Sequence, residues 1–253
     1  MLLVIKMKYI KELAKNKTFT IEDVNKLIPD RNQARNFLSN ATKNGYIARI
    51  KKILYSVINI ENERVIANKY EIASNITPSS FISHHSAFEF YNLYNQVTNS
   101  ITVSSITKFN DFEYEHETYK HISTNTDIYT IMINDIKVST IERTIVDSIK
   151  DSGKLCELEE ILNCIDYLNN ININDVLNYL KFLDNKILYK KVGIILSLFK
   201  DNLNIPDSFF KECLELAGNV KGYFENTNKL SHIYNSEWKI YMPKGYENLI
   251  NKE

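Results

Sequence analysis

Residues 29–57, "PDRNQARNFLSNATKNGYIARIKKILYSV", decide the fold of the amino-terminal region. Asp30 can cap a helix that begins directly after it, and Gln33 then occupies the third position of that helix. Gly45 stands where a carboxy-terminal helix cap is expected. Residues 46–57 alternate apolar with polar side chains around a basic centre, which indicates two strands of a hairpin. The stretch therefore predicts a helix followed directly by a β-hairpin.

The predicted helix has two chemically different faces. Its apolar residues fall within about 100° of arc and predict a buried stripe, made of Ala34, Phe37, Leu38 and Ala41. The other face is polar, and Asn and Arg are residue types that can read adenine and guanine through paired hydrogen bonds. The candidate DNA-reading residues are Arg31, Asn32, Arg35, Asn36, Ser39 and Lys43. The alternative is a plain solvated face, because Asn is abundant throughout the chain.

Two further helices are expected before this one, over residues 7–14 and 21–28. Thr20 is the expected cap of the second, with Asp23 at its third position. Helix, helix–turn–helix and basic hairpin is the order of a winged helix-turn-helix, in which the third helix enters the major groove and the wing holds phosphates. The candidate phosphate-binding residues of the wing are Arg49, Lys51 and Lys52, and no glycine marks its tip. A winged helix that makes only protein contacts is the alternative.

Charge is divided unevenly along the chain although the formal net charge is zero. Residues 1–60 hold 12 Lys/Arg and 4 Asp/Glu, whereas residues 61–253 hold 19 Lys/Arg and 27 Asp/Glu. A basic terminus on an acidic body is typical of a polyanion-binding module attached to something else. We therefore predict a DNA-binding domain over 1–60 and a second, larger domain over 61–253.

Composition indicates an ordinary soluble protein. Of the 253 residues, 44% are hydrophobic and 25% charged, and no apolar run reaches the roughly 20 residues that span a bilayer. The opening "MLLVI" is too short for a signal-peptide core. Three cysteines without a CxxC pair are read as free thiols of a reducing compartment. We expect a cytoplasmic protein with no membrane partner.

The body offers two groups of residues to which chemistry could be assigned. His84 and His85 precede an apolar run and are expected to open a buried helix, and a catalytic or zinc-binding role would need partners that the sequence does not identify. Residues 111–122 alternate as one strand would, with Asp111, Glu113, Glu115 and Glu117 on one face. Four aligned carboxylates could bind a cation, act in catalysis or meet a basic partner, but the outer face of a sheet is the simpler interpretation.

No motif for catalysis, metal binding or cofactor binding occurs. The chain has six glycines and no glycine-rich phosphate loop, and neither HExxH nor GxSxG is present. We predict no catalytic residue, metal, cofactor or small-molecule substrate, hence no enzyme. An enzyme that uses the carboxylates of 111–117 or the histidines is kept as the least favoured hypothesis.

Residues 139–153 predict a helix that opens the rest of the body. Ser139 and Glu142 form a capping-box pattern, and Arg143 and Asp147 are expected to pair on the surface for a few tenths of a kcal/mol. Amphipathic helices are expected around 155–168, 174–184, 188–200 and 206–217, before a closing strand in "EWKIYMP". With the strands expected over 100–133, the whole chain is predicted to be α+β, a winged helix-turn-helix followed by a larger mixed α/β domain.

The order of these parts resembles the AbiEi-type antitoxins of type IV toxin–antitoxin systems, which act in abortive infection. The resemblance is carried by "FTIEDV…ARNFLSNATKNGYIARIKKILYSV", "ISHHSAFEFYNLY", "VSTIERTIVDSI" and "YKKVGIILSLF", which occur in the family's order over most of the chain. "IERTIVD" is the most specific of them.

The resemblance implies a protein with two roles and no catalytic activity. The winged helix would repress its own operon by binding inverted-repeat operator DNA. The carboxy-terminal antitoxin domain would neutralise a cognate nucleotidyltransferase-like toxin, directly or indirectly. The alternative is a stand-alone winged-helix transcriptional regulator whose body senses a ligand or a protein. A nucleotidyltransferase-like reading frame next to the gene would favour the antitoxin.

Overall fold

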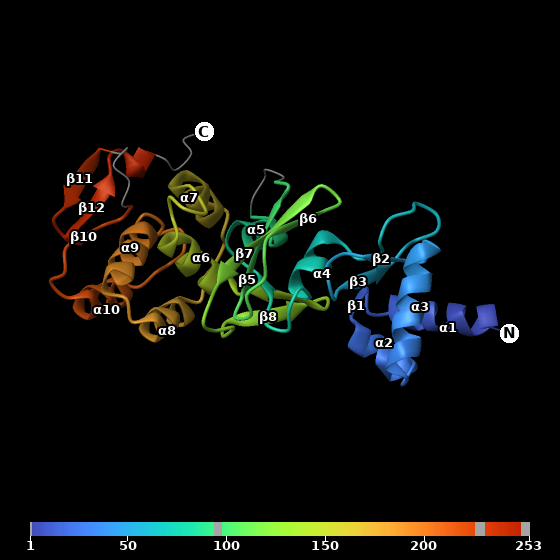
Figure 1. Ribbon diagram of the computed structural model, residues 1–253. Helices are drawn as coiled ribbons and strands as arrows, with labels where there is room; N and C mark the ends of the chain where they lie inside the picture. Colours follow the sequence, from blue (N-terminus) through green and yellow to red (C-terminus); the bar gives the residue numbers. More distant parts are fainter. Residues whose placement is uncertain (1, 94–97, 226–230, 249–253) are drawn as a thin grey trace. The chain divides into compact units, whose positions relative to one another are not determined.

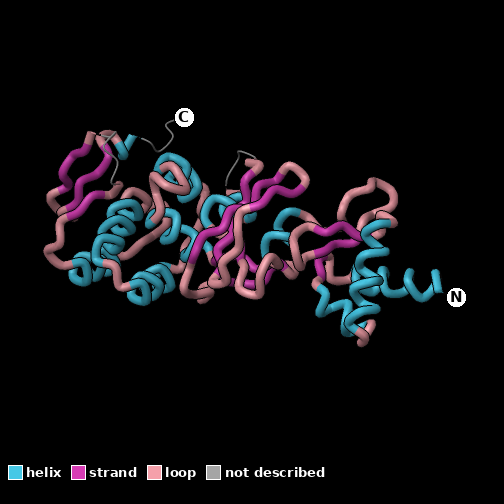
Figure 2. The backbone as a smooth tube through the Cα atoms, in the orientation of Figure 1, coloured by secondary structure: helices cyan, strands magenta, loops and turns pink. Residues whose placement is uncertain are grey.

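A computed structural model describes residues 2–93, 98–225 and 231–248, with side chains from residue 7 onward. The fold is α+β, and the described residues contain ten α-helices and three sheets (Figures 1 and 2). The chain divides into two compact units. The first consists of residues 1–82, 99–127 and 132–137, and the second of residues 83–98, 128–131 and 138–253. The first unit thus continues beyond the boundary predicted at residue 60.

The amino-terminal part of the first unit has three helices and a small antiparallel sheet. In chain order its elements are α1 (Leu2–Ala14), β1 (Thr18–Phe19), α2 (Ile21–Leu27), α3 (Arg31–Lys43), β2 (Ile47–Arg49) and β3 (Tyr55–Val57). The strand order is β1-β3-β2, so the hairpin of β2 and β3 adds to the short strand before α2. Its core is its own, because Leu13, Phe19, Val24 and Ile47 pack with the apolar face of α3.

Local hydrogen bonds place the ends of α2 and α3 where the sequence predicts them. The Thr20 backbone N–H donates to Asp23 Oδ2 at 2.9 Å, and the Gln33 N–H donates to Asp30 Oδ1 at 2.7 Å. Gly45 follows α3 with φ of +72°, a left-handed conformation that glycine adopts without strain. The four apolar residues predicted to be buried in α3 are its buried residues. These expectations are confirmed.

The remainder of the first unit carries most of a larger sheet. After α4 (Lys69–Ser74) come β4 (Phe81–Ile82), β5 (Ser100–Ser105), β6 (Phe112–Tyr114) and β7 (Glu117–Ser123). The sheet has six strands in the order β6-β7-β5-β4-β9-β8, where β8 is Thr130–Ile133 and β9 is Ile136–Ser139. β5 pairs with β7 in parallel and with β4 antiparallel.

The prediction of one strand over 111–122 is wrong. β6 and β7 form an antiparallel hairpin, with Tyr114 opposite Glu117. The two residues between them, Glu115 and His116, both have positive φ, 46° and 69°, as a tight hairpin turn requires. The four carboxylates therefore do not lie in a row on one strand.

The second unit is mainly helical. It contains α5 (His84–Phe90), α6 (Ile141–Lys150), α7 (Leu158–Asp166), α8 (Ile173–Leu183), α9 (Lys186–Ser197), α10 (Asp207–Ala217) and a three-stranded sheet of β10 (Gly222–Tyr223), β11 (His232–Asn235) and β12 (Ile240–Pro243), before a short 3₁₀ turn at Tyr246–Asn248. One large apolar core joins these elements. Trp238, the single tryptophan of the chain, is 2% exposed there. Its indole lies where a β-carbon of Gly193 would be, so α9 needs glycine at this point.

Two expectations for α6 are wrong. The cap is Thr140, whose hydroxyl accepts from the Arg143 N–H, and not Ser139, which bonds to Thr144 inside the unit. The pair of Arg143 and Asp147 is not on the surface, because their side chains are 1% and 4% exposed. Arg143 Nε donates to Asp147 Oδ2 at 3.1 Å. The spacing of four residues correctly predicts that the two side chains meet, but it contains no information on their burial.

Candidate nucleic-acid interface

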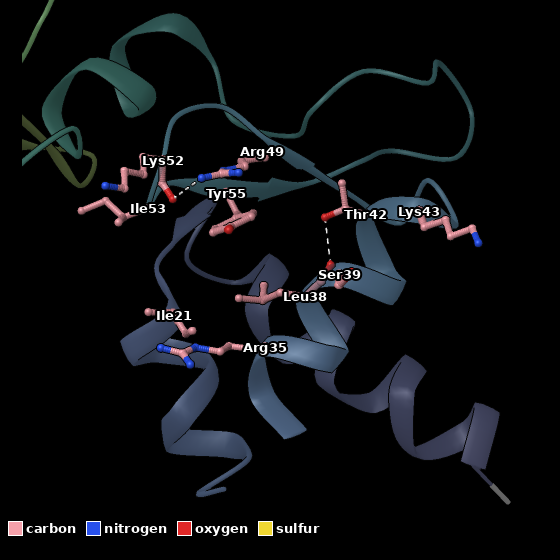
Figure 3. Close-up of a pocket in the computed structure, with 10 residues that line it drawn as sticks. All are labelled: Ile21, Arg35, Leu38, Ser39, Thr42, Lys43, Arg49, Lys52, Ile53 and Tyr55. Atoms are coloured by element: carbon pink, nitrogen blue, oxygen red, sulfur yellow. Dashed lines mark hydrogen bonds between the residues drawn. The ribbon is translucent and has the colours of Figure 1, made fainter. Parts of the chain in front are cut away.

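A groove of about 700 Å³ lies between α3 and the hairpin that follows it. Figure 3 shows the ten side chains that line it, which come from α2, α3 and the hairpin of β2 and β3. They are Ile21, Arg35, Leu38, Ser39, Thr42, Lys43, Arg49, Lys52, Ile53 and Tyr55. Four of the ten are cationic and none is acidic, so the groove concentrates positive charge.

The structure exposes every residue predicted to read DNA from α3. Arg35, Ser39 and Lys43 line the groove, at intervals of four residues along one side of the helix. Three others, Arg31, Asn32 and Asn36, are exposed on α3 but do not line it. The groove therefore brings together half of the predicted set.

The turn between β2 and β3 is closed by an arginine side chain. Arg49 Nη2 donates to the Lys52 carbonyl at 2.9 Å (Figure 3), and its Nε lies 3.4 Å from the Lys51 carbonyl. The Ile50 N–H donates to the Leu54 carbonyl at 2.9 Å. No residue of this turn has a positive φ, which explains why it contains no glycine.

Lys51 does not line the groove. Its Nζ donates to the Asn110 carbonyl at 2.7 Å and lies 4.4 Å and 4.1 Å from the ring centroids of Phe109 and Phe112. Burial against these rings lowers the pKa of Lys51, although Asp111 acts in the opposite direction. The lysine thus attaches the turn to the β6 region of the same unit. Its ammonium would have to leave this place to bind a phosphate.

Lys52, like Arg49, is a predicted wing cation that is exposed and lines the groove. In Figure 3 it extends beside Ile53, at the opposite end of the groove from Lys43. Two acidic side chains of this region pair with lysines outside the groove, Asp23 with Lys26 at 2.7 Å and Glu12 with Lys15 at 2.7 Å. Nothing acidic on the groove wall offsets its cations.

Some lining residues were not predicted from the sequence. Ile53 is 53% exposed at the turn, and Tyr55 and Ile21 form the apolar wall beneath the cations. Thr42 also lines the groove, and its hydroxyl donates to the Leu38 carbonyl at 2.9 Å. An exposed isoleucine inside a basic turn is a sequence signal for such a wall, because an apolar side chain contributes nothing to an interaction made by charge alone.

The two histidines singled out in the sequence are parts of the second unit. His84 is 1% exposed, and its ring lies 2.9 Å from Ser83 Oγ and 3.2 Å from Asp151 Oδ2. These are the residue types of a hydrolytic triad, but Ser83 is 0% exposed and has no route to a substrate. His85 lies 3.2 Å from Thr98 Oγ1. The chain Ser83–His84–Asp151 connects the start of α5 to the end of α6.

The other candidate chemistries find no assembled site. All three cysteines are free and buried, and burial raises the pKa of Cys156 and of Cys213 to about 12. Within the described residues, no three His, Cys, Asp or Glu side chains are grouped so that they could hold a metal ion. None of the described helices combines the length and the hydropathy that crossing a bilayer requires. The tail of "ISHHSAFEFYNLY", Tyr94, lies outside the described residues.

Comparison with protein families and with curated protein sequences gives no match. Among solved structures, the chain is similar to the Rv2827c protein of Mycobacterium tuberculosis, with a TM-score of 0.61 and 11% sequence identity. The similarity covers 94% of this chain and 91% of that one. At such low identity it shows that the two chains share a fold over nearly their full lengths.

Proposed function

We propose that residues 1–60 form a winged helix-turn-helix that binds duplex DNA through the groove between α3 and the β2–β3 turn, which we call the wing. The observation that carries the proposal is the groove itself, with four cationic side chains, no acidic one, and exposed polar groups of α3 along one wall. A helix that presents Arg and Ser to base edges, beside a basic turn that meets phosphates, is the arrangement by which this class of domain reads the major groove.

The groove divides the predicted contacts into two kinds. Arg35 and Ser39 lie on the middle of α3 and would face base edges. Lys43 and Lys52, near the two ends of the groove, would hold phosphates on either side. Arg49 lines the groove while it closes the turn, so it positions the wing as well as adding charge. Lys51 is left out of the phosphate-binding set because it is held by Asn110 and two rings.

The test measures binding of the full chain to its own promoter DNA and to random duplex DNA, by fluorescence anisotropy over a series of salt concentrations. Arg35→Ala should cost about 1–3 kcal/mol on promoter DNA and less on random DNA, because a lost base contact removes discrimination. Lys52→Ala should weaken both about equally and reduce the salt slope by about one unit.

Lys11→Ala is the matched control, since Lys11 is an exposed lysine of α1 that does not line the groove. It should change neither the promoter affinity nor the salt slope by as much as Lys52→Ala. Equal losses in all three variants, or wild-type binding without salt dependence, would refute the assignment of the groove.

For the whole chain, the resemblance in sequence supports a type IV antitoxin. Under this proposal the amino-terminal region represses the operon at inverted repeats, and the body neutralises a nucleotidyltransferase-like toxin, directly or indirectly, without catalysis of its own. The stand-alone regulator with a sensing body remains the second candidate. The motif at 139–149, the most specific part of the resemblance, favours the antitoxin without excluding the regulator.

Co-expression with the neighbouring gene separates the two candidates. If that gene arrests growth, co-expression of the full chain should restore growth. A chain with Arg35→Ala and Lys52→Ala should also restore growth when it is expressed from an independent promoter. Rescue that is lost in the groove variant would mean that neutralisation requires DNA binding. A neighbouring gene without toxicity, alone or in any combination, would favour the regulator.

A further inference from the structure

The second unit contains a basic pocket that the proposed DNA-binding role does not use. Its volume is about 290 Å³, and it lies among α6, α9 and β10. The polar lining groups are Lys150, Lys191 and Asn185, and the walls are Ile187, Leu188, Gly222 and Tyr223. The lining contains two lysines from different helices and no acidic residue.

The two lysines differ in how their charges are balanced. Lys150 Nζ lies 3.0 Å from Asp147 Oδ1 and 3.5 Å from Asp151 Oδ2, so its charge is shared with two carboxylates. Lys191 has no hydrogen-bond acceptor or ion-pair partner among the described residues, and its Nζ lies 5.3 Å from the ring centroid of Phe224. Burial lowers the pKa of Lys191, with Lys154 adding to that effect and the carboxylates of Glu225 and Asp151 opposing it. Lys191 is therefore a partly buried cation without a direct anionic contact among the described residues.

The carboxylates near the pocket are engaged by groups other than Lys191. The Asp147 carboxylate accepts hydrogen bonds from Arg143 and from Lys150, and the Asp151 carboxylate is hydrogen-bonded to His84. Glu225 accepts a hydrogen bond from the Ser152 hydroxyl. Each carboxylate near the two lysines thus has a partner other than Lys191.

The shape of the pocket limits what can enter it. Gly222 forms part of the wall, and a β-carbon there would come within 2.6 Å of Ile187 Cδ1. Asn185 uses its carboxamide oxygen to accept from the Ile187 and Leu188 N–H groups, which leaves its NH₂ group as a donor. The volume is just below the usual range for small-molecule sites, which begins at about 300 Å³. Two ammonium groups and an amide donor in so small a space suit a compact, doubly charged oxyanion.

We propose that this pocket binds the phosphate group of a small phosphate monoester, with Lys191 as the main counter-charge and Lys150 and Asn185 as further donors. The organic part of the ligand would lie along the walls formed by Ile187 and Tyr223. The site is separate from the DNA-binding groove, and its occupancy is a property of the second unit.

The test is calorimetric titration of the full chain with three probes: inorganic phosphate, glycerol 3-phosphate and adenosine 5′-monophosphate. Tighter binding of either ester than of inorganic phosphate identifies an ester as the ligand, and the comparison between esters shows which organic part fits. Lys191→Gln should lower the affinity for the best-binding probe about tenfold or more, whereas Lys191→Arg should retain most of that affinity. Lys211→Gln, which removes an exposed lysine of α10, is the control and should bind as the wild type does.

A second measurement on the wild type does not depend on the folding of a variant. Amine acetylation followed by mass spectrometry should show that the best probe protects Lys191, while Lys211 is acetylated at an unchanged rate. Three results would overturn the proposal: no binding of any probe at millimolar concentration, the same affinity in Lys191→Gln as in the wild type, or equal losses in Lys191→Gln and Lys211→Gln. Inorganic phosphate binding as tightly as both esters would overturn the assignment to an ester.

Discussion

The buried ion pair of α6 predicts a large loss of stability in Asp147→Asn. The carboxylate accepts from Arg143 Nε at 3.1 Å, from the Tyr179 hydroxyl at 3.1 Å and from Lys150 Nζ at 3.0 Å. The substitution preserves the volume of the side chain but removes the counter-charge of a guanidinium that is 1% exposed. Removing one partner of a buried pair costs about 3–5 kcal/mol, whereas a surface pair four residues apart is worth about 0.2–0.5 kcal/mol.

Trp238 provides the assay. It is the single tryptophan of the chain and is buried in the core of the second unit, so urea unfolding followed by its fluorescence reports on that unit. Linear extrapolation should give a free energy of unfolding at least about 3 kcal/mol below that of the wild type. Asp201→Asn makes the same chemical change at an exposed position of the same unit and should stay within about 0.5 kcal/mol of the wild type.

The double variant Arg143→Met, Asp147→Leu tests the reason for the loss. With both charges removed, the pair no longer leaves a buried cation, so the double variant should be more stable than Asp147→Asn. It should not surpass the wild type, because Lys150 and the Tyr179 hydroxyl also lose their acceptor. A loss below about 1 kcal/mol in Asp147→Asn would refute the reasoning.

Three further predictions concern other contacts. Lys51→Met should speed amide hydrogen exchange in the wing, because the contacts of the Lys51 ammonium stabilise it by about 1–2 kcal/mol. The same variant should leave the salt slope of DNA binding unchanged. A slope reduced by about one unit would show that the lysine reaches a phosphate. Burial would raise the pKa of Asp147 and of Asp151, but nearby cations outweigh it and hold both pKa values below 3.8, so these groups stabilise the fold above about pH 4 and cease to do so as the pH falls through their lowered pKa values. The urea midpoint of Asp147→Asn should accordingly decline less than that of the wild type between pH 5 and the acid limit, and parallel curves would contradict this. Gly193→Ala should destabilise the second unit by about 1–3 kcal/mol and shift the emission of Trp238, whereas the stabilisation that alanine brings to an unobstructed helix would argue against the contact.

The parts of the fold that could be predicted from sequence are those set by neighbours along the chain. Asp30 with Gln33, and Thr20 with Asp23, are three residues apart, so the hydrogen bonds that begin α3 and α2 are contained in the local sequence. The buried stripe of α3 follows from helical periodicity in the same way. The positive φ of Gly45 needs no information from elsewhere in the chain.

What the sequence could not supply depends on distant residues or on rare turn conformations. Glu115 and His116 form a tight hairpin turn without Gly or Asn, so the alternating pattern on both sides is indistinguishable from that of a single strand. In the candidate site, the exposure of Arg35 followed from periodicity, but the position of Lys51 did not. It is set by Asn110 and Phe112, about sixty residues further along the chain.

The arginine that closes the wing turn has a consequence for how such a protein can diverge. The guanidinium of Arg49 hydrogen-bonds to two carbonyls of the turn and also lines the groove, so a single residue determines both the conformation of the turn and part of the charge of the groove. A substitution that removes this guanidinium therefore changes the geometry of the turn together with the charge of the groove. The Lys52 side chain makes no such second contact among the described residues, so a change there alters the charge of the groove and leaves the turn closed by Arg49.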